Sequence, residues 1–337
     1  MIYHSLGRTT VQVSEICLGC LPFGSTTEPK EACSIIDRSI DAGVNFFDTA
    51  NAYGCGRSEE VTGAALKANG KRAKIVLATK VHWRMADDDP NAAGNSRRHI
   101  IEQCEASLQR LQTDYIDLYQ IHRPQSDTPI DETLRALDDL IRAGKVRYIG
   151  CSTFAAWQVV ESLWVAKELG LNRFVCEQPP YNLLDRRIER ELLPMAQTYG
   201  FAVIPWSPIG GGLLTGKYRR DKMPKTGRFA DVSALPPEIA RRLTPGVFDL
   251  VDKLDPIAAE KGCTVSQLAL AWVLGRPGVT SPIIGPRSME QFEENLGALE
   301  VVLTDEDLAQ IDELVPPGSM ISPFYEADFG PHVHRCL

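Results

Sequence analysis

The sequence lacks the features that define membrane, secreted and nucleic-acid-binding proteins. No uninterrupted apolar run is long enough to span a bilayer, and the first residues lack the charged-then-apolar layout of a secretory signal. Basic residues are not in excess, since 36 Lys and Arg stand against 44 Asp and Glu, so we expect no broad cationic surface for nucleic acid or anionic lipid. These absences predict a cytoplasmic protein that binds neither nucleic acid nor membrane, and that holds any anionic ligand in a local site.

Cysteine is present, but not in a pattern that indicates disulfides or a metal. The nine cysteines are an odd number without a repeating framework, which is typical of a reduced compartment. Cys17 and Cys20 form one C-x-x-C, whereas a structural zinc site usually needs a second pair. His332, His334 and Cys336 are expected to lie in a disordered tail. No metal site is therefore predicted.

Short apolar runs alternate with amphipathic segments of helical length along most of the chain. Eight runs are expected to be strands: I-C-L-G, V-N-F-F-D, K-I-V-L-A-T-K, Y-I-D-L-Y-Q-I-H, V-R-Y-I-G-C-S, R-F-V-C-E-Q, F-A-V-I-P-W-S and V-T-S-P-I-I-G-P. Continuous Val, Ile and Leu runs are typical of parallel strands that helices cover on both faces. Eight such units without a linker predict an α/β fold, a single (β/α)8 TIM barrel domain over residues 1–337, rather than an open doubly wound sheet.

Three segments depart from this alternation. Residues 1–15 are expected to form an N-terminal β-hairpin with a turn at Gly7, covering one mouth of the barrel. Residues 218–244 are charged and proline-bearing, and residues 316–337 form a C-terminal tail. Because long loops inside compact domains are usually functional, we expect long loops at the C-terminal face of the barrel, with 218–244 as a cover over a ligand.

Polar side chains follow three neighbouring strands of the predicted barrel. The second strand ends in Asp48, with Tyr53 in the next loop; the third ends in Lys80, and the fourth in His122. Each alone has an ordinary explanation, as a helix cap, a packed ring, a solvated cation or a core histidine. Because catalytic groups of such barrels lie at the C-terminal ends of strands, their convergence favours an active site.

These four residue types suit the protonation of a carbonyl oxygen. A phenol has an ordinary pKa of about 10, too high for efficient donation at neutral pH unless a cation stabilises the phenolate. Lys80 supplies that cation for Tyr53, and Asp48 pairs with its ammonium. His122 is placed to orient and polarise the carbonyl.

Reduction also needs a hydride donor, which no side chain supplies. No G-x-G-x-x-G follows a strand, so a Rossmann-type site is not supported. Segments 150–153 and 176–178 end two strands with hydroxyl and amide groups suited to a carboxamide, and Trp206 can stack on a flat ring. Three consecutive glycines would let the backbone of residues 209–213 approach a pyrophosphate, although an ordinary glycine-rich loop has the same pattern. Arg287 precedes an expected helix and suits the 2′-phosphate of NADP.

In this order the motifs resemble the aldo-keto reductase superfamily across essentially the whole chain, and most of all its bacterial and potassium-channel β-subunit-like branch. They are G-V-N-F-F-D-T-A-N-A-Y-G, L-A-T-K, R-L-Q-T-D-Y-I-D-L-Y-Q-I-H-R-P, G-K-V-R-Y-I-G-C-S-T-F, Q-P-P-Y-N-L, W-S-P-I-G-G-G-L-L-T-G-K-Y and I-I-G-P-R-S-M-E-Q-F-E-E-N. His122 stands where channel-associated members tend to have Asn, which favours enzymatic activity. Thr153 departs from the Asn or Arg of many members.

The resemblance implies that Tyr53 is the general acid, supported by Lys80, Asp48 and His122. It implies that the nicotinamide, diphosphate and adenosine ends of NADPH, with NADH as an alternative donor, are bound by Ser152, Thr153, Gln178, Trp206, Ser207, Pro208, Ile209, Gly210, Gly211, Leu213, Gly216, Lys217, Gly285, Arg287, Gln291, Glu294 and Asn295. Arg228, in the long loop, is a candidate clamp for a cofactor phosphate.

The first functional hypothesis is an NADPH-dependent oxidoreductase that reversibly reduces a small-molecule aldehyde or ketone. A second is an NADP-binding regulatory subunit that senses redox state and turns over slowly. A third is a lyase in which Lys80 forms a Schiff base. Phe23, Trp83 and Phe324 are expected to line an apolar substrate pocket, and the sequence carries no signal for oligomeric state.

Overall fold

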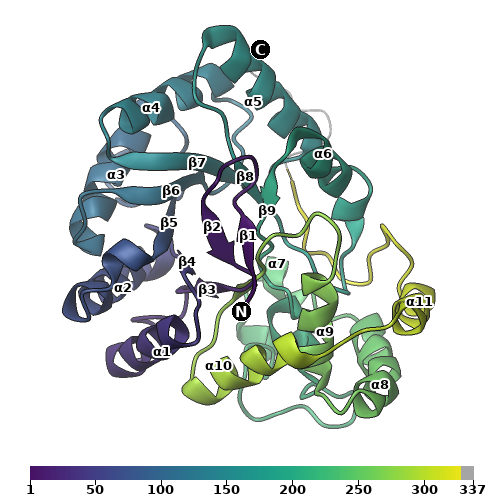
Figure 1. The fold of residues 1–337 in the computed structure, drawn as a ribbon. Coiled ribbons are helices and arrows are strands. Elements are labelled where there is room, and N and C mark those ends of the chain that lie inside the picture. Colours follow the sequence, from purple (N-terminus) through teal and green to yellow (C-terminus); the bar gives the residue numbers. More distant parts are fainter. Residues whose placement is uncertain (328–337) are drawn as a thin grey trace.

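Eight parallel strands form one curled sheet in the computed structural model of the protein, which describes residues 1–327 (Figure 1). Their order around the sheet is β10 (Ile283–Ile284), β3 (Cys17–Gly19), β4 (Phe46–Asp48), β5 (Val76–Val81), β6 (Ile116–Ile121), β7 (Val146–Ser152), β8 (Cys176–Gln178) and β9 (Ala202–Val203). The two edges meet through short contacts, because Ile283 N donates to Pro205 O at 2.8 Å and Thr280 N donates to Val203 O at 2.8 Å. The predicted (β/α)8 barrel is confirmed.

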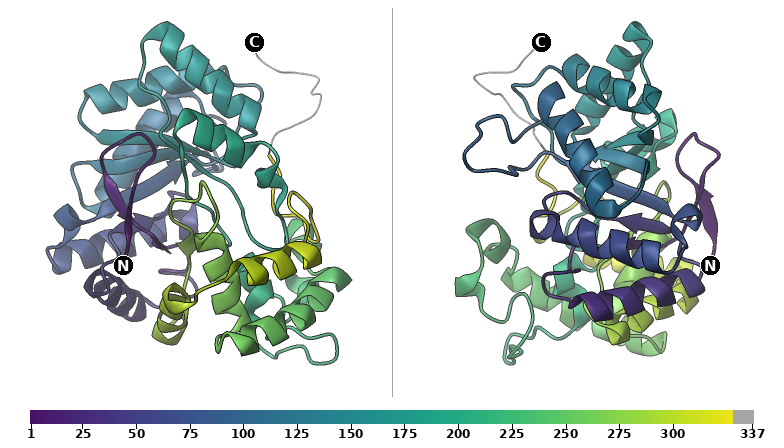
Figure 2. Two further views of the ribbon diagram at one scale, coloured as in Figure 1. Left: turned by 45° about the vertical axis from the view of Figure 1, so that its right-hand side comes forward. Right: turned by 90° about the vertical axis from the view of Figure 1, so that its left-hand side faces the viewer.

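Helices surround the sheet on its outer side (Figures 1 and 2). The longer ones are α1 (Pro29–Asp41), α2 (Arg57–Ala68), α3 (Arg97–Leu111), α4 (Ile130–Arg142), α5 (Ala156–Leu169), α6 (Leu192–Tyr199), α8 (Pro245–Glu260), α9 (Val265–Leu274), α10 (Met289–Leu296) and α11 (Asp305–Leu314). Local sequence sets several of their starts: Ser96 caps α3 by accepting from His99 N, and Thr264 and Gln267 form a capping box at α9. Among residues 1–327, no helix is long and apolar enough to cross a membrane.

The N-terminal hairpin covers the N-terminal mouth of the barrel. It consists of the antiparallel strands β1 (Tyr3–Ser5) and β2 (Gln12–Ser14), and its buried Leu6 and Val13 pack against the interior apolar residues of the strands. Gly7 has a φ of 59°, and a Cβ there would lie 2.5 Å from Val175 O. The turn therefore needs glycine both for its conformation and for its close contact with the barrel.

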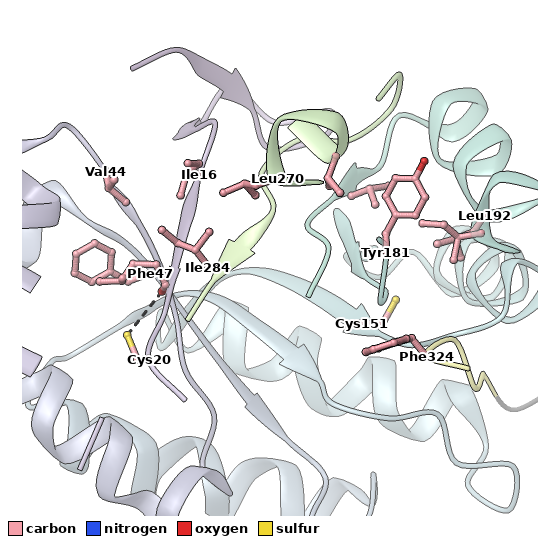
Figure 3. Close-up of a cluster of buried hydrophobic side chains, with 14 of the residues drawn as sticks. Ile16, Cys20, Val44, Phe47, Cys151, Tyr181, Leu192, Leu270, Ile284 and Phe324 are labelled. Atoms are coloured by element: carbon pink, nitrogen blue, oxygen red, sulfur yellow. Dashed lines mark hydrogen bonds between the residues drawn. The ribbon is translucent and has the colours of Figure 1, made fainter. Parts of the chain in front are cut away.

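The hydrophobic core has two parts. The larger part lies between the sheet and the helices and includes Ile16, Val44, Phe47 and Ile284 (Figure 3). The smaller part fills the barrel and includes Phe46, Ala78, Leu118 and Cys176. Because side chains alternate along a strand, the next inward residues after this apolar layer are Asp48, Lys80, Gln120 and Gln178. The interior thus changes from apolar to polar toward the C-terminal mouth.

The long segment 218–244 is not wholly irregular. It contains a 3₁₀ helix, Val232–Ala234, and the short helix α7 (Pro237–Ala240). The right-hand view of Figure 2 places this green segment and the purple hairpin on opposite sides of the molecule. The tail approaches the barrel through Asp185, whose Oδ2 accepts from the backbone N of Phe324 and of Tyr325 at 2.7 Å each.

Candidate active site

Three of the four predicted catalytic side chains form one hydrogen-bonded chain at the C-terminal mouth. Asp48 ends β4, Lys80 lies near the end of β5, and Tyr53 begins a 3₁₀ helix, Tyr53–Gly56, after β4. Lys80 Nζ donates to Asp48 Oδ2 at 2.5 Å and to Tyr53 OH at 3.2 Å. His122 follows β6 directly, and its ring centroid lies 5.6 Å from that of Tyr53. The structure therefore brings all four residues together.

Asp48 is a buried carboxylate whose two oxygens are both engaged. Oδ2 pairs with Lys80, while Oδ1 accepts from Gln120 Nε2 at 3.1 Å and from Gln178 Nε2 at 2.9 Å. Lys80 Nζ donates in addition to Thr49 O at 2.8 Å. These contacts come from the inward layer of the strands, so the ammonium has a fixed position beneath the phenol.

Burial and the ion pair set the protonation of Lys80 and Tyr53. Burial alone would lower the pKa of Lys80, but the adjacent Asp48 and Tyr53 raise it above its ordinary value, so the amine stays protonated. Burial raises the pKa of Tyr53 above 10.0, and the Lys80 ammonium opposes this rise without cancelling it. Tyr53 is therefore a protonated donor, and Lys80 limits the cost of its phenolate rather than producing a phenolate at rest.

The chain turns sharply after Tyr53. Gly54, Cys55 and Gly56 have φ values of 57°, 52° and 93°. The left-handed conformation of Cys55 costs about 1–2 kcal/mol, because its Cβ is crowded there. A Cβ on Gly56 would lie 2.6 Å from Arg110 Cδ. This turn leads the chain from β4 into α2 and leaves Tyr53 over Lys80.

His122 is buried and uncharged at neutral pH. Burial, the Lys80 ammonium and the Arg123 guanidinium hold its pKa well below the ordinary 6.5. Its Nδ1 has no hydrogen-bond partner among residues 1–327. A neutral imidazole beside Tyr53 can donate one hydrogen bond to a carbonyl oxygen without competing with Lys80 for the phenol.

The expected pocket residues occupy three different environments. Trp83 is 44% exposed, and its ring lies edge-on to His122 with centroids 6.1 Å apart. Phe324 is 1% exposed and its ring centroid lies 6.5 Å from that of Trp206. Phe23 is fully buried in the main core and has no exposed surface to offer a ligand.

The residues expected at the nicotinamide lie beside the catalytic group. Ser152 Oγ donates to Gln178 O at 2.8 Å, and Trp206 Nε1 donates to Thr153 Oγ1 at 3.4 Å. Thr153 and Ser207 both have positive φ, of 60° and 54°. The Gln178 amide nitrogen is already engaged with Asp48, so this side chain joins the expected nicotinamide site to the catalytic layer.

The glycine-rich loop after β9, residues 210–216 (the glycine cradle), contains four glycines in the left-handed conformation. Gly210, Gly211, Gly212 and Gly216 have φ values of 60°, 61°, 100° and 75°. Nothing lies within 4 Å of the position of a Cβ on Gly212. The flanking Pro208 and Leu213 are buried, and Ile209 packs against the main core. Successive amides in left-handed conformations can converge on a phosphate.

Three cations, Lys217, Arg228 and Arg287, lie around this loop. A Cβ on Gly211 would lie 3.3 Å from Arg228 Nη1, and Lys217 Nζ lies 3.3 Å from the corresponding position of Gly227. Burial, with the nearby Arg287, lowers the pKa of Arg228. Within the described part of the chain, neither the Arg228 nor the Arg287 guanidinium has a carboxylate within 4.0 Å. Such unneutralised cations suit a phosphorylated ligand.

The remaining predicted cofactor residues lie on and before α10. Ser288 caps this helix, and Gln291 Oε1 accepts from Arg287 N at 2.9 Å. Glu294 Oε1 accepts from Ser266 Oγ at 2.6 Å and so also supports the start of α9. Asn295 is buried, and Gly285 is exposed just before the helix.

Gln120, Arg123 and Arg242 lie at the site but were not predicted from the sequence. Gln120 supports Asp48, and its inward position two residues before His122 is a signal that strand alternation offers. Arg123 Nη1 donates to Thr153 Oγ1 at 3.0 Å, and its place directly after His122 was a weaker signal. The segment around Arg242 has no periodicity that would have placed it here.

No group of three His, Cys, Asp or Glu side chains in residues 1–327 is arranged to hold a metal ion. Cys17 and Cys20 are both buried, and burial raises the pKa of the Cys20 thiol to about 12, which disfavours the thiolate that a metal would need. His332, His334 and Cys336 lie outside the described residues.

Comparison with known proteins shows the family of the chain. The sequence model described as "Aldo/keto reductase family" matches residues 15–316. A probable voltage-gated potassium channel subunit beta of Oryza sativa subsp. japonica is 40% identical, over 94% of this chain and 97% of its own. The uncharacterized oxidoreductase YrpG of Bacillus subtilis is also 40% identical, over 94% and 97%. A versiconal hemiacetal acetate reductase of Aspergillus parasiticus is 33% identical, over 94% and 98%.

Proposed function

The chain belongs to the aldo/keto reductase family, and from this premise we propose that it is an NADPH-dependent oxidoreductase that reduces an aldehyde or ketone to an alcohol in a reversible reaction. The observation that carries the proposal is the contact of 3.2 Å between Lys80 Nζ and Tyr53 OH, within a buried and fully hydrogen-bonded Asp48 network. A protonated phenol held against a fixed ammonium is suited to proton donation.

The proton transfer follows from these side chains. A carbonyl oxygen between Tyr53 OH and the neutral His122 receives the phenolic proton as negative charge develops on it. The phenolate that remains is stabilised by Lys80, whose charge Asp48 balances. A bound nicotinamide would supply the hydride. In the reverse direction the phenolate accepts the proton of the alcohol.

The cofactor assignment rests on the glycine cradle and the cations around it. Gly211 and Gly212 expose backbone at positive φ, and Arg228 lies against them without a carboxylate among the described residues. These features fit a dinucleotide diphosphate, and Arg287 fits the additional 2′-phosphate that distinguishes NADPH from NADH. Trp206 would stack on the nicotinamide. The free state of the described cysteines is consistent with a cytoplasmic location.

The similarity to potassium channel β subunits favours a second candidate, an NADP-binding regulatory subunit with slow turnover. The complete Asp48, Tyr53, Lys80 and His122 set favours the reductase. A Schiff-base lyase is disfavoured, because Lys80 is buried, ion-paired and has a raised pKa, whereas Schiff-base chemistry needs a free amine.

The loss of NADPH absorbance in the presence of excess aromatic aldehyde separates these functions. A reductase oxidises many equivalents of NADPH per chain, and NADH serves less well. Oxidation that stops at about one equivalent, with NADPH tightly bound, would support the regulatory subunit. Borohydride trapping of a carbonyl compound on Lys80 without any nicotinamide would support the lyase.

A further inference from the structure

Two arginines at the C-terminal mouth of the barrel, Arg123 and Arg242, form no ion pair with an acidic side chain of residues 1–327. The Arg123 guanidinium lies 5.9 Å from the Trp83 ring centroid and 5.8 Å from that of Trp206. The Arg242 guanidinium lies 5.8 Å from the same Trp206 centroid and 4.6 Å from that of Phe324. Both cations are thus held against the aromatic rings that surround the reaction site.

Within the described part of the chain, the hydrogen bonds of these two cations engage only a minority of their donors. Arg123 Nη1 donates to His122 O at 2.8 Å and to Thr153 Oγ1 at 3.0 Å. Arg242 Nε is buried without a partner among residues 1–327. A guanidinium removed from water without an acceptor is costly, so these donors are poised for a ligand.

The acidic side chains of this region are engaged elsewhere. Glu326 pairs with Arg241, and Asp185 pairs with Arg187 at 2.6 Å. Glu177 Oε1 accepts from Phe154 N at 2.8 Å, and burial raises the pKa of its carboxyl well above the ordinary value, which favours the neutral form. Burial lowers the pKa of both Arg123 and Arg242; the nearby Glu326 opposes this decrease at both residues, whereas Arg228 adds to it at Arg242. Among residues 1–327, however, no carboxylate lies within 4.0 Å of either guanidinium, so neither arginine has an ion-pair partner of its own.

We propose that Arg123 and Arg242 select carbonyl substrates that carry an anionic group, a carboxylate or a phosphate, on an apolar or aromatic body. The guanidinium fork matches both oxyanions, and the ring of Trp83, which is 44% exposed, would hold the body of the substrate. The cofactor phosphates have their own cations, since Lys217, Arg228 and Arg287 lie at the glycine cradle and α10. This inference rests on the proposed reductase function and adds a substrate class to it.

The test compares anionic aldehydes with neutral counterparts that have the same aromatic skeleton. The three isomers of carboxybenzaldehyde are compared with their methyl esters, and 4-formylphenyl phosphate is compared with 4-methoxybenzaldehyde, each with saturating NADPH. We expect kcat/KM to be at least tenfold higher for the best anion than for its neutral counterpart, because hydrogen bonds to charged groups are among the stronger ones. The preferred anion distinguishes a carboxylate site from a phosphate site.

Substitutions of the two arginines then test whether these residues cause the preference for anionic substrates. Arg242→Gln should lower the acid-to-ester ratio about tenfold, mainly through KM, and Arg242→Lys should restore part of it. Arg220→Gln is the matched control, because Arg220 lies in the same long segment but pairs with Asp249 at the surface, and it should leave the ratio unchanged. The dissociation constant of NADPH, measured by fluorescence quenching, should stay the same in variants whose acid-to-ester ratio falls. This result would separate the proposed substrate site from the site of the cofactor phosphates.

The outcomes are distinct. Equal turnover of anionic and neutral aldehydes by the parent chain would overturn the anion preference and leave the reductase intact. A preference that persists in both Arg123→Gln and Arg242→Gln would overturn the assignment to these residues. Absence of NADPH-dependent turnover with every aldehyde would refute the reductase function and this inference with it.

Discussion

Substitution of Lys80 by Met removes the cation on which the site is built. With an effective dielectric constant of about 20, an ammonium and a phenolate 3.2 Å apart attract each other by about 5 kcal/mol. Half of this attraction corresponds to a factor of roughly 70 in rate, and the whole to a factor of roughly 5 × 10³. We therefore expect the kcat of Lys80→Met to fall by roughly 10²- to 10⁴-fold.

The same substitution tests the stability of the network. Asp48 would keep its amide donors Gln120 and Gln178 but lose its only buried counter-ion among the described residues. Removal of one partner of a buried ion pair costs about 3–5 kcal/mol, whereas removal of both costs less. Asp48→Asn/Lys80→Met should accordingly unfold at a higher urea concentration than Lys80→Met.

The assay combines single-turnover oxidation of bound NADPH with urea unfolding followed by circular dichroism. The double-mutant cycle isolates the coupling of Asp48 with Lys80, which are in direct contact. A Lys80→Met variant that keeps both the parent rate and the parent free energy of unfolding would refute the role assigned to the ion pair.

Three further outcomes are expected. Arg287→Gln should raise the dissociation constant of NADPH about tenfold and leave that of NADH nearly unchanged, because Arg287 is assigned to the 2′-phosphate; equal effects on both would contradict this. As pH falls below 6.5, the unfolded chain takes up a proton at His122 that the folded chain does not, so this residue lowers the free energy of unfolding by up to about 1.36 kcal/mol per pH unit. Urea unfolding at several pH values should therefore show a weaker dependence of this free energy on pH for His122→Asn. Gly7→Ala should destabilise the protein more than Gly70→Ala, because the added Cβ at Gly7 would lie 2.5 Å from Val175 O, whereas nothing lies within 4 Å of the Cβ position at Gly70. For Gly70→Ala about 1 kcal/mol is expected from its φ of 66° alone. Similar urea midpoints for the two variants would argue against the hairpin contact.

The barrel was predictable because its strands have a strong local signal. Continuous apolar runs ending in polar residues placed Asp48 and Lys80 on neighbouring strands, and their positions relative to Ala78 and Gln120 follow from the parallel register. The family model that matches residues 15–316 confirms the resemblance carried by the motifs. β9 and β10 are only two residues long, so these strands are shorter than the apolar runs from which they were predicted.

The site could be predicted only where strand position determines it. The net effect of burial on the pKa of Tyr53 depends on how completely the ring is covered, which the sequence does not contain. Arg242 reaches Trp206 and Phe324 from a segment without periodicity, and Phe23 is covered by packing that no local pattern indicates. These features arise from contacts between distant parts of the chain.

The most direct test of the central claim is the single-turnover rate of bound NADPH with an aromatic aldehyde in the parent and in Tyr53→Phe. The substitution removes only the phenolic hydroxyl that contacts Lys80 Nζ. If Tyr53 is the proton donor, the rate should fall by roughly 10²- to 10⁴-fold while the dissociation constant of NADPH stays the same. A Tyr53→Phe variant that reduces the aldehyde at the parent rate would contradict the account.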